Sequence, residues 1–130
     1  RVMQNYCSEP KNAELLGLAE RWLVDLQETE APRTAAANPH QLMRVLEVDD
    51  ILCCARMIVA ACQARRASSA VLHFERLDYP QMDPPEWHKW LVIRRQGDEV
   101  QVSDRPITFW GDFESHYRPR HASNLAAFAA

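Results

Sequence analysis

One long segment, residues 38–69, constrains the fold of this 130-residue chain more than any other. It opens with Asn38, a residue type that caps helices, and continues with Pro39 at the first helical position, where proline is favoured. Gln41 stands where a capping box places Glu or Gln. The pattern predicts a helix over 39–66, about 42 Å long at about 1.5 Å per residue. Its second half is apolar on most sides, which is typical of a central helix covered by neighbours.

Two further helices are predicted before the long one. Residues 12–28 carry apolar side chains at helical spacing, and Asn12 is a candidate N-cap. A short helix precedes them and ends at Pro10. Because helical spacing places them on apolar faces, we expect five side chains in the core: Trp22, Leu42, Leu46, Leu52 and Val59.

The hydrophobic period changes after Ser69. Residues 71–76 alternate as in a strand, and two further segments, 88–95 and 99–103, predict a β-hairpin. Gly97 lies in the turn between them and can supply a positive φ. The sequence therefore predicts a mainly α fold, an antiparallel bundle of about three helices followed by a small β-hairpin element.

The length of the chain is enough for one domain with a modest core. Within it we expect a helical bundle over 1–70, an extended segment and β-hairpin packed on it over 71–120, and a disordered tail over 121–130. The chain starts at Arg1 without Met, which indicates a processed chain or a piece of a longer one.

Charge, hydropathy and cysteine usage narrow the class of protein. The net charge of −3 gives no electrostatic reason to expect nucleic-acid binding. A membrane span needs about 20 consecutive apolar residues, and the chain has no such run; nor does its start resemble a signal peptide. The cysteines form no C-x-x-C motif. We interpret them as small buried hydrophobes in a reducing compartment, the cytoplasm: Cys7, Cys53, Cys54 and Cys62.

Glycine is scarce, and this excludes two kinds of nucleotide site. The three glycines stand alone at positions 17, 97 and 111. Neither G-x-G-x-x-G nor a P-loop can be built from them, so no glycine-rich turn here can wrap a dinucleotide or a phosphate. We therefore expect no cofactor-binding residue in this chain.

Candidate catalytic and metal-binding side chains are few. His116 and His121 lie near arginines, which disfavours a metal site. The pair Asp49 and Asp50 is typical of a solvated helix face. His73 is either a proton donor or a packed or hydrogen-bonded structural histidine, and the second interpretation is favoured. No catalytic residue and no metal ligand is predicted.

The stretch Glu-Arg-Leu-Asp-Tyr-Pro, residues 75–80, is the most distinctive polar cluster. Arg76 and Asp78 are two positions apart, so they project to the same side of an extended segment. An arginine there can bind a carboxylate through two hydrogen bonds or clamp backbone carbonyls. Pro80 fixes the exit of the segment. We interpret the cluster as a corner that holds parts of the fold together rather than as a catalytic site.

Two stretches, residues 38–69 and 73–92, resemble the C-terminal region of the succinate dehydrogenase and fumarate reductase flavoprotein family. The resemblance looks closest to the branch that contains adenylylsulfate reductase alpha subunits, and it covers roughly residues 1–100. In the family pattern, a long helix ends in Ala-Arg-x-Glu-Ser-Arg and Arg-x-Asp-Tyr-Pro follows. This chain departs from the pattern with Ala67 and Ser69 in place of the Glu and the second Arg. The matching positions are Leu42, Met43, Arg44, Leu46, Glu47, Ala64, Arg65, Ser68, Arg76, Asp78, Tyr79, Pro80, Asp83 and Trp87.

The resemblance implies a parent FAD-dependent oxidoreductase whose FAD-binding and substrate domains lie upstream of this region. It implies FAD in the parent protein and no cofactor in this chain. It also implies two partners, the FAD-binding domain of the same polypeptide and an iron–sulfur subunit. A structural docking motif is carried over from it: Arg65, Ser68, Arg76, Asp78, Tyr79, Pro80 and Trp87.

The alternative is a stand-alone helical interaction module without catalysis, a homodimer that buries the central helix against a second copy. A small enzyme that uses His73 and Arg76 is the least favoured class. The reading frame upstream of Arg1 discriminates between the first two, because a G-x-G-x-x-G sequence there favours the flavoprotein.

Overall fold

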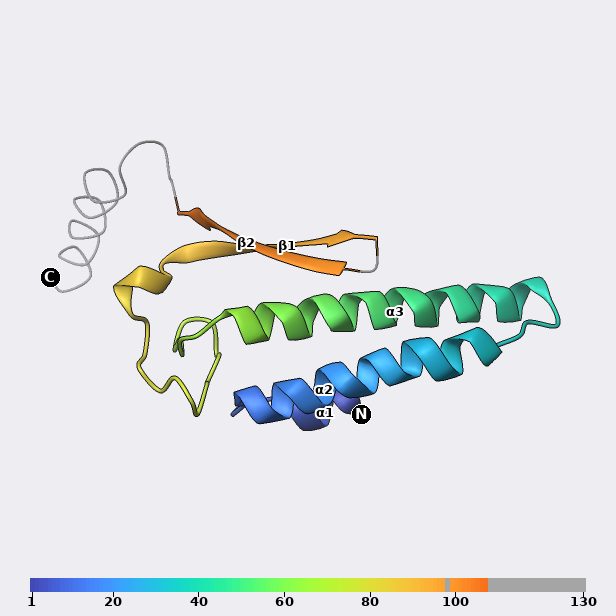
Figure 1. The fold of residues 1–130 in the computed structure, drawn as a ribbon, viewed down its shortest axis with the longest axis horizontal. Coiled ribbons are helices and arrows are strands. Elements are labelled where there is room, and N and C mark those ends of the chain that lie inside the picture. Colours follow the sequence, from blue (N-terminus) through green and yellow to red (C-terminus); the bar gives the residue numbers. More distant parts are fainter. Residues whose placement is uncertain (98, 108–130) are drawn as a thin grey trace, which may run out of the picture.

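The computed structural model describes residues 1–97 and 99–107 of the chain. They form a mainly α fold with a small β-hairpin after the helices, as predicted. Figure 1 shows α3 in the middle, with α2 and α1 on one side of it and the hairpin on the other. The elements follow in the order α1 (Val2–Tyr6), α2 (Ala13–Asp25), a π-helical turn (Leu26–Glu30), a 3₁₀ turn (Ala31–Arg33), α3 (Pro39–Ala64), a 3₁₀ turn (Pro85–Trp87), β1 (Lys89–Gln96) and β2 (Glu99–Pro106).

Both long helices begin with the caps that the sequence predicts. The Asn12 side chain accepts a hydrogen bond from the N–H of Leu15 at 2.8 Å, and Asn38 accepts one from Gln41 at 2.9 Å. The Gln41 side chain in turn accepts from the N–H of Ala37 at 2.8 Å. Side chains at both ends of the first helical turn therefore accept backbone hydrogen bonds at the start of α3, as in a capping box. None of the described helices is long and apolar enough to cross a membrane.

The core lies between α2 and the second half of α3. Ala19 and Leu23 of α2 meet Ala55 and Val59 of α3, and all four are at most 6% exposed. The small side chains of the two alanines let the helices approach closely. The prediction for Val59 is confirmed, and Leu52 is half-buried. With Leu52, four residues from the start of the chain pack against the cluster: Val2, Met3, Tyr6 and Cys7.

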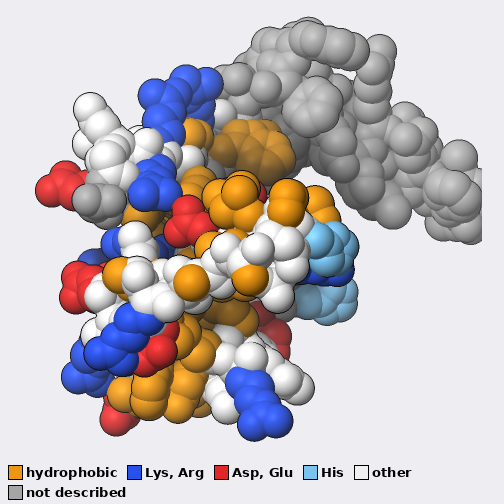
Figure 2. Space-filling model, turned by 90° about the vertical axis from the view of Figure 1, so that its right-hand side faces the viewer, with side chains coloured by type: hydrophobic (Ala, Val, Ile, Leu, Met, Phe, Trp, Pro, Cys, Tyr) orange, Lys and Arg blue, Asp and Glu red, His pale blue; other side chains and the backbone are white. Residues whose placement is uncertain are grey.

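Three of the five predicted core residues are exposed, so that part of the prediction is wrong. Trp22 is 49% exposed, Leu42 50% and Leu46 58%. On α2, the buried line passes through Leu23 and leaves its neighbour Trp22 at the rim. On α3, the two buried residues, Ala55 and Val59, both lie in the second half. Figure 2 looks onto the end where α2 and α3 are joined and shows hydrophobic side chains at the surface there.

The hairpin forms as predicted, with the first arm shifted by one residue and the second arm extended to Pro106. β1 and β2 pair antiparallel from Lys89 opposite Pro106 to Gln96 opposite Glu99. Gly97 adopts a φ of +63° in the turn, a conformation that side chains disfavour. Both strands contact α3, so the hairpin covers a second side of that helix.

The strand predicted over 71–76 does not form, and this prediction is wrong. Ser69 and Phe74 pair through two backbone hydrogen bonds of 2.7 and 3.0 Å, and the residues between them make a turn. His73 lies in this turn with a φ of +47° and is exposed, so of the two structural alternatives the packed one is wrong. Among the described residues, the segment pairs through isolated bridges, Ser69 with Phe74 and Lys11 with Arg76, and not through a continuous ladder with a neighbouring strand.

The cysteines are more exposed than predicted. All four are free thiols; Cys7, Cys53 and Cys62 are half-buried, and Cys54 is exposed. The prediction of buried cysteines is therefore wrong for Cys54. Its side of α3 faces neither α2 nor the hairpin, and it lines a surface groove instead.

We predict that Leu23→Ala lowers the free energy of unfolding by about 2–5 kcal/mol, because it leaves a cavity between α2 and α3. The matched control is Leu46→Ala, which removes the same atoms at an exposed position. That change should cost less than about 0.5 kcal/mol. Urea denaturation followed by circular dichroism measures both, and equal losses would contradict the observed placement of the core.

Candidate functional site

Three segments of the chain meet at one end of the helical bundle, and we call this cluster the corner (residues 9–13, 62–69 and 74–83). Isolated β-bridges join these segments to one another. In one of them, the N–H of Lys11 donates to the carbonyl of Glu75 at 3.1 Å. The corner therefore lies where α2 begins and α3 ends.

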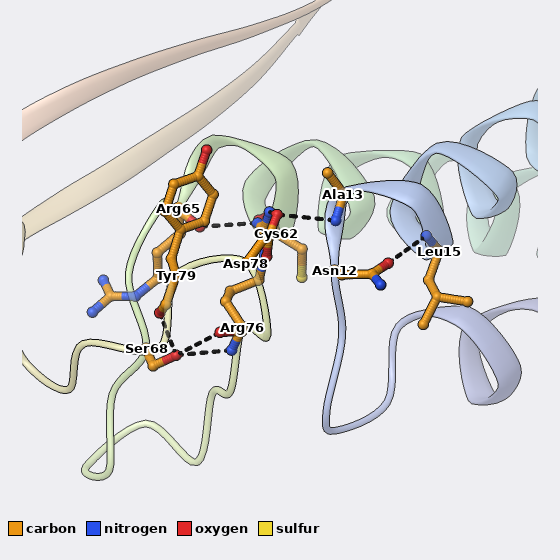
Figure 3. A network of polar contacts seen from close by, with 9 residues as sticks. All are labelled: Asn12, Ala13, Leu15, Cys62, Arg65, Ser68, Arg76, Asp78 and Tyr79. Carbon is orange, nitrogen blue, oxygen red and sulfur yellow. Dashed lines mark hydrogen bonds and ion pairs between the residues drawn. The ribbon is translucent and has the colours of Figure 1, made fainter.

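The Arg76 side chain occupies the centre of the corner and is 2% exposed (Figure 3). Its Nη1 donates to the carbonyls of Cys62 and Arg65, at 2.6 and 3.0 Å. These carbonyls belong to the end of α3 and have no partner within the helix. A cation at this end also interacts favourably with the helix dipole. Arg76 thus caps α3 from a loop that follows it in the chain.

Asp78 links Arg76 to the start of α2. Its carboxylate accepts hydrogen bonds from Nε and Nη2 of Arg76 at 2.8 and 2.6 Å. It also accepts from the N–H of Ala13, the first residue of α2, at 3.1 Å. A negative charge is favourable at a helix N-terminus. The hydrogen bonds from Arg76 lower the pKa of the Asp78 carboxyl below its usual value, so the carboxylate form is stabilised.

Ser68 is fully buried and joins two segments of the corner, 62–69 and 74–83. Its Oγ accepts from the backbone N–H of Arg76 and donates to the carbonyl of Tyr79, both at 2.8 Å (Figure 3). An unpaired hydroxyl at such a depth would be costly, and here both its donor and its acceptor capacity are used.

Arg65, the C-cap of α3, lies at the outer side of the corner. The centre of its guanidinium is 5.8 Å from the rings of both Phe74 and Trp87. Partial burial lowers the pKa of Arg65, and the negative charge of nearby Asp83 opposes that shift. The Nε of Arg65 is buried, and it has no hydrogen-bond partner in the part of the chain that the structure describes. Aromatic rings rather than acceptors therefore hold this side chain.

The remaining motif residues lie around this network. The Tyr79 ring is 5.1 Å from the guanidinium of Arg76, and Pro80 follows it at the surface. Trp87 has a second cation, Lys89, with its Nζ 4.7 Å from the ring. The seven residues of the predicted docking motif thus lie in or beside the corner. Their role in docking stays a prediction.

Lys11 is a central residue of the corner that the sequence analysis missed. It is 2% exposed, forms an ion pair with Glu9 and lies with its Nζ 4.3 Å from the centre of the Phe74 ring. Its backbone also pairs with that of Arg76. A single lysine before an N-cap gives no sequence signal for burial, because lysine is almost always exposed.

The groups of the corner are arranged to brace the fold rather than to perform chemistry. Four hydrogen bonds already occupy the guanidinium of Arg76. Burial raises the pKa of the Cys7 and Cys62 thiols, so neither is an activated nucleophile at neutral pH.

A metal site and a flavin site each require particular groups of side chains or glycines. Within residues 1–97 and 99–107, no three His, Cys, Asp or Glu side chains come together in a way that could hold a metal ion. Gly17 lies inside α2 and Gly97 in the hairpin turn. These two glycines do not fit a turn around the pyrophosphate of FAD, which needs backbone N–H groups at a glycine-rich helix start.

We predict that Arg76→Ala lowers the free energy of unfolding by about 3–5 kcal/mol, because it removes the ion pair of the Asp78 carboxylate and leaves two carbonyls of α3 without their donor. Arg76→Lys should recover only part of this loss, since an ammonium cannot reproduce the planar fork. The exposed neighbour of the C-cap gives the control, Arg66→Ala, with a change within about 0.5 kcal/mol. Urea denaturation of the three variants measures these changes in the free energy of unfolding. A negligible effect of Arg76→Ala would refute the bracing role.

We predict that stability falls in acid and that Asp78→Asn removes part of this fall. The pKa of Asp78 is lower in the folded chain than in the unfolded one. Its contribution is therefore complete above the unfolded pKa of about 3.9 and is lost as the pH drops through the folded pKa. Thermal unfolding between about pH 2 and pH 7 measures the effect. The exposed Asp25→Asn should keep the wild-type profile, and an unchanged acid slope in Asp78→Asn would contradict the prediction.

Comparison with known proteins places the corner in a family. A family model described as the fumarate reductase flavoprotein C-terminus matches residues 1–121, a stretch that contains the whole corner. No curated protein matches the chain. The family resemblance noted from the sequence is thereby confirmed, at the level of the family rather than of one branch. The chain belongs to the family of fumarate reductase flavoprotein C-terminal domains.

Proposed function

We propose that this chain is the C-terminal helical domain of an FAD-dependent oxidoreductase and that it packs on the FAD-binding domain of the same polypeptide. Membership of a flavoprotein family supports FAD in the parent protein. The packing rests on one observation, an apolar side of α3 that neither α2 nor the hairpin covers.

The uncovered side of α3 forms a groove together with α1. Ile51 is 64% exposed and Ile58 is 51% exposed. Positions 51, 54 and 58 are three and four residues apart, so they share one side of the helix. Almost all the surface of the groove is apolar. We call it the docking face, and it consists of Met3, Asp50, Ile51, Cys54, Ala55 and Ile58.

An apolar groove of this kind favours an interface. α2 packs on one side of α3, and β1 and β2 pack on another, so two sides of the helix are covered within the chain. A helix that is apolar on most sides is normally enclosed by its neighbours. Contiguous apolar surface with polar residues at its rim is a common mark of a binding partner.

The start of the chain lies next to the docking face. α1 begins at Val2, and Met3 lines the groove. A polypeptide joined to Arg1 would therefore emerge beside this face, and the domain before it would need no long linker to cover it. This adjacency favours the FAD-binding domain of the same polypeptide over a separate protein.

We predict that Cys54 is protected from thiol reagents in the intact flavoprotein, although its side chain is exposed in this chain. Alkylation by N-ethylmaleimide, mapped by mass spectrometry, should be at least about tenfold slower at Cys54 than at an exposed reference thiol. Glu28→Cys supplies the reference, at an exposed position in the turn after α2. Cys54→Ser identifies the labelled peptide.

Equal labelling rates at the two positions would refute the proposed packing. Protection that disappears on dilution would assign the docking face to a second copy of the chain, because only an intermolecular contact depends on protein concentration. Protection that is independent of concentration is the expected outcome.

A further inference from the structure

Arg65 continues the docking face beyond the end of α3. Positions 51, 58 and 65 are each about two helical turns apart, so they lie along one side of the helix. Ile51 and Ile58 supply apolar surface, and Arg65 follows them as the C-cap of the helix. A partner that covers the apolar groove and extends to the end of α3 would meet this guanidinium.

The guanidinium of Arg65 has aromatic neighbours and no acceptor among the described residues. Its centre lies 5.8 Å from the rings of both Phe74 and Trp87, and its buried Nε has no hydrogen-bond partner in that part of the chain. None of the ion pairs found in that part of the chain includes Arg65. Figure 3 shows its side chain pointing away from Arg76 and out of the network of polar contacts.

Asp83, the nearby carboxylate, is already engaged elsewhere. It accepts a hydrogen bond from the N–H of Ala70 at 3.1 Å and another from the hydroxyl of Ser69. Its charge acts on Arg65, but the two side chains form no ion pair. The guanidinium of Arg65 therefore still has hydrogen-bond donors that can bind a carboxylate from outside the described residues.

We propose that Arg65 is a carboxylate-binding residue that receives an Asp or Glu side chain of the FAD-binding domain at the edge of the docking face. This inference rests on the proposed packing of the two domains. A partly desolvated arginine without an acceptor is costly, and a carboxylate satisfies the planar fork with two parallel hydrogen bonds. The two rings hold the guanidinium in one place beforehand, which lowers the entropy lost on binding.

The test uses the intact flavoprotein with Arg65→Lys, which keeps a cation beside the rings and introduces a reactive amine. A carbodiimide couples amines to carboxylates in direct contact, and mass spectrometry then identifies the joined residues. We expect one cross-link from position 65 to an Asp or Glu upstream of Arg1. Arg66→Lys is the matched control at the adjacent exposed position, with a yield at least about tenfold lower because no contact orients its amine.

A second readout needs no substitution. Phenylglyoxal modifies accessible arginines, and in the intact wild-type flavoprotein Arg65 should react at least about tenfold more slowly than Arg66. This measurement keeps the proposal testable if Arg65→Lys fails to fold.

The outcomes separate the two proposals. A cross-link only to Asp83, or none, would overturn the assignment of Arg65, as would equal modification of Arg65 and Arg66 by phenylglyoxal. If Cys54 were still protected in the same preparation, the packing of the domains would stand without this contact. If Cys54 reacted as an exposed thiol, the packing would fail, and the carboxylate site with it.

Discussion

The bidentate ion pair between Arg76 and Asp78 is the interaction on which the rest of this structure depends. One side of the pair binds the last carbonyls of α3, and the other binds the first N–H of α2. Each charge therefore faces the helix end whose dipole it complements. Because Ser68 and the backbone of Lys11 hold the loop that carries the pair, the contact fixes where α2 lies along α3.

Two arginines at the same end of α3 have opposite roles. Arg76 points inward, and four hydrogen bonds to the chain itself satisfy its guanidinium. Arg65 points outward beside two aromatic rings and lacks an acceptor among the described residues. The inner arginine sets the position of the helices, so the proposed docking face and the outer arginine are held as one prearranged surface. That division fits the proposed packing on a neighbouring domain.

Local signals in the sequence predicted more of the fold than of the packing. Asn38 and its proline predicted the start of α3 because capping depends on adjacent residues alone. Leu46 was placed in the core wrongly, since a helical pattern shows which residues share a side and not which neighbour covers it. The spacing of Arg76 and Asp78 predicted that they act together, but their acceptor and donor on α3 and α2 are set by the tertiary fold. Lys11 had no local signal at all.

The hydrogen bond from Ala13 to Asp78 spans 65 positions of the chain, and this separation affects the order of folding. Contacts between distant segments form late, because closing a long loop costs entropy before any contact repays it. During synthesis both long helices leave the ribosome before the loop that joins their ends. Both helices can form early, yet they stay free to slide along each other until residues 76–78 have emerged. A nascent chain that stalls earlier would therefore expose the apolar sides of its helices to chaperones. Release from the chaperones would then follow the synthesis of the corner.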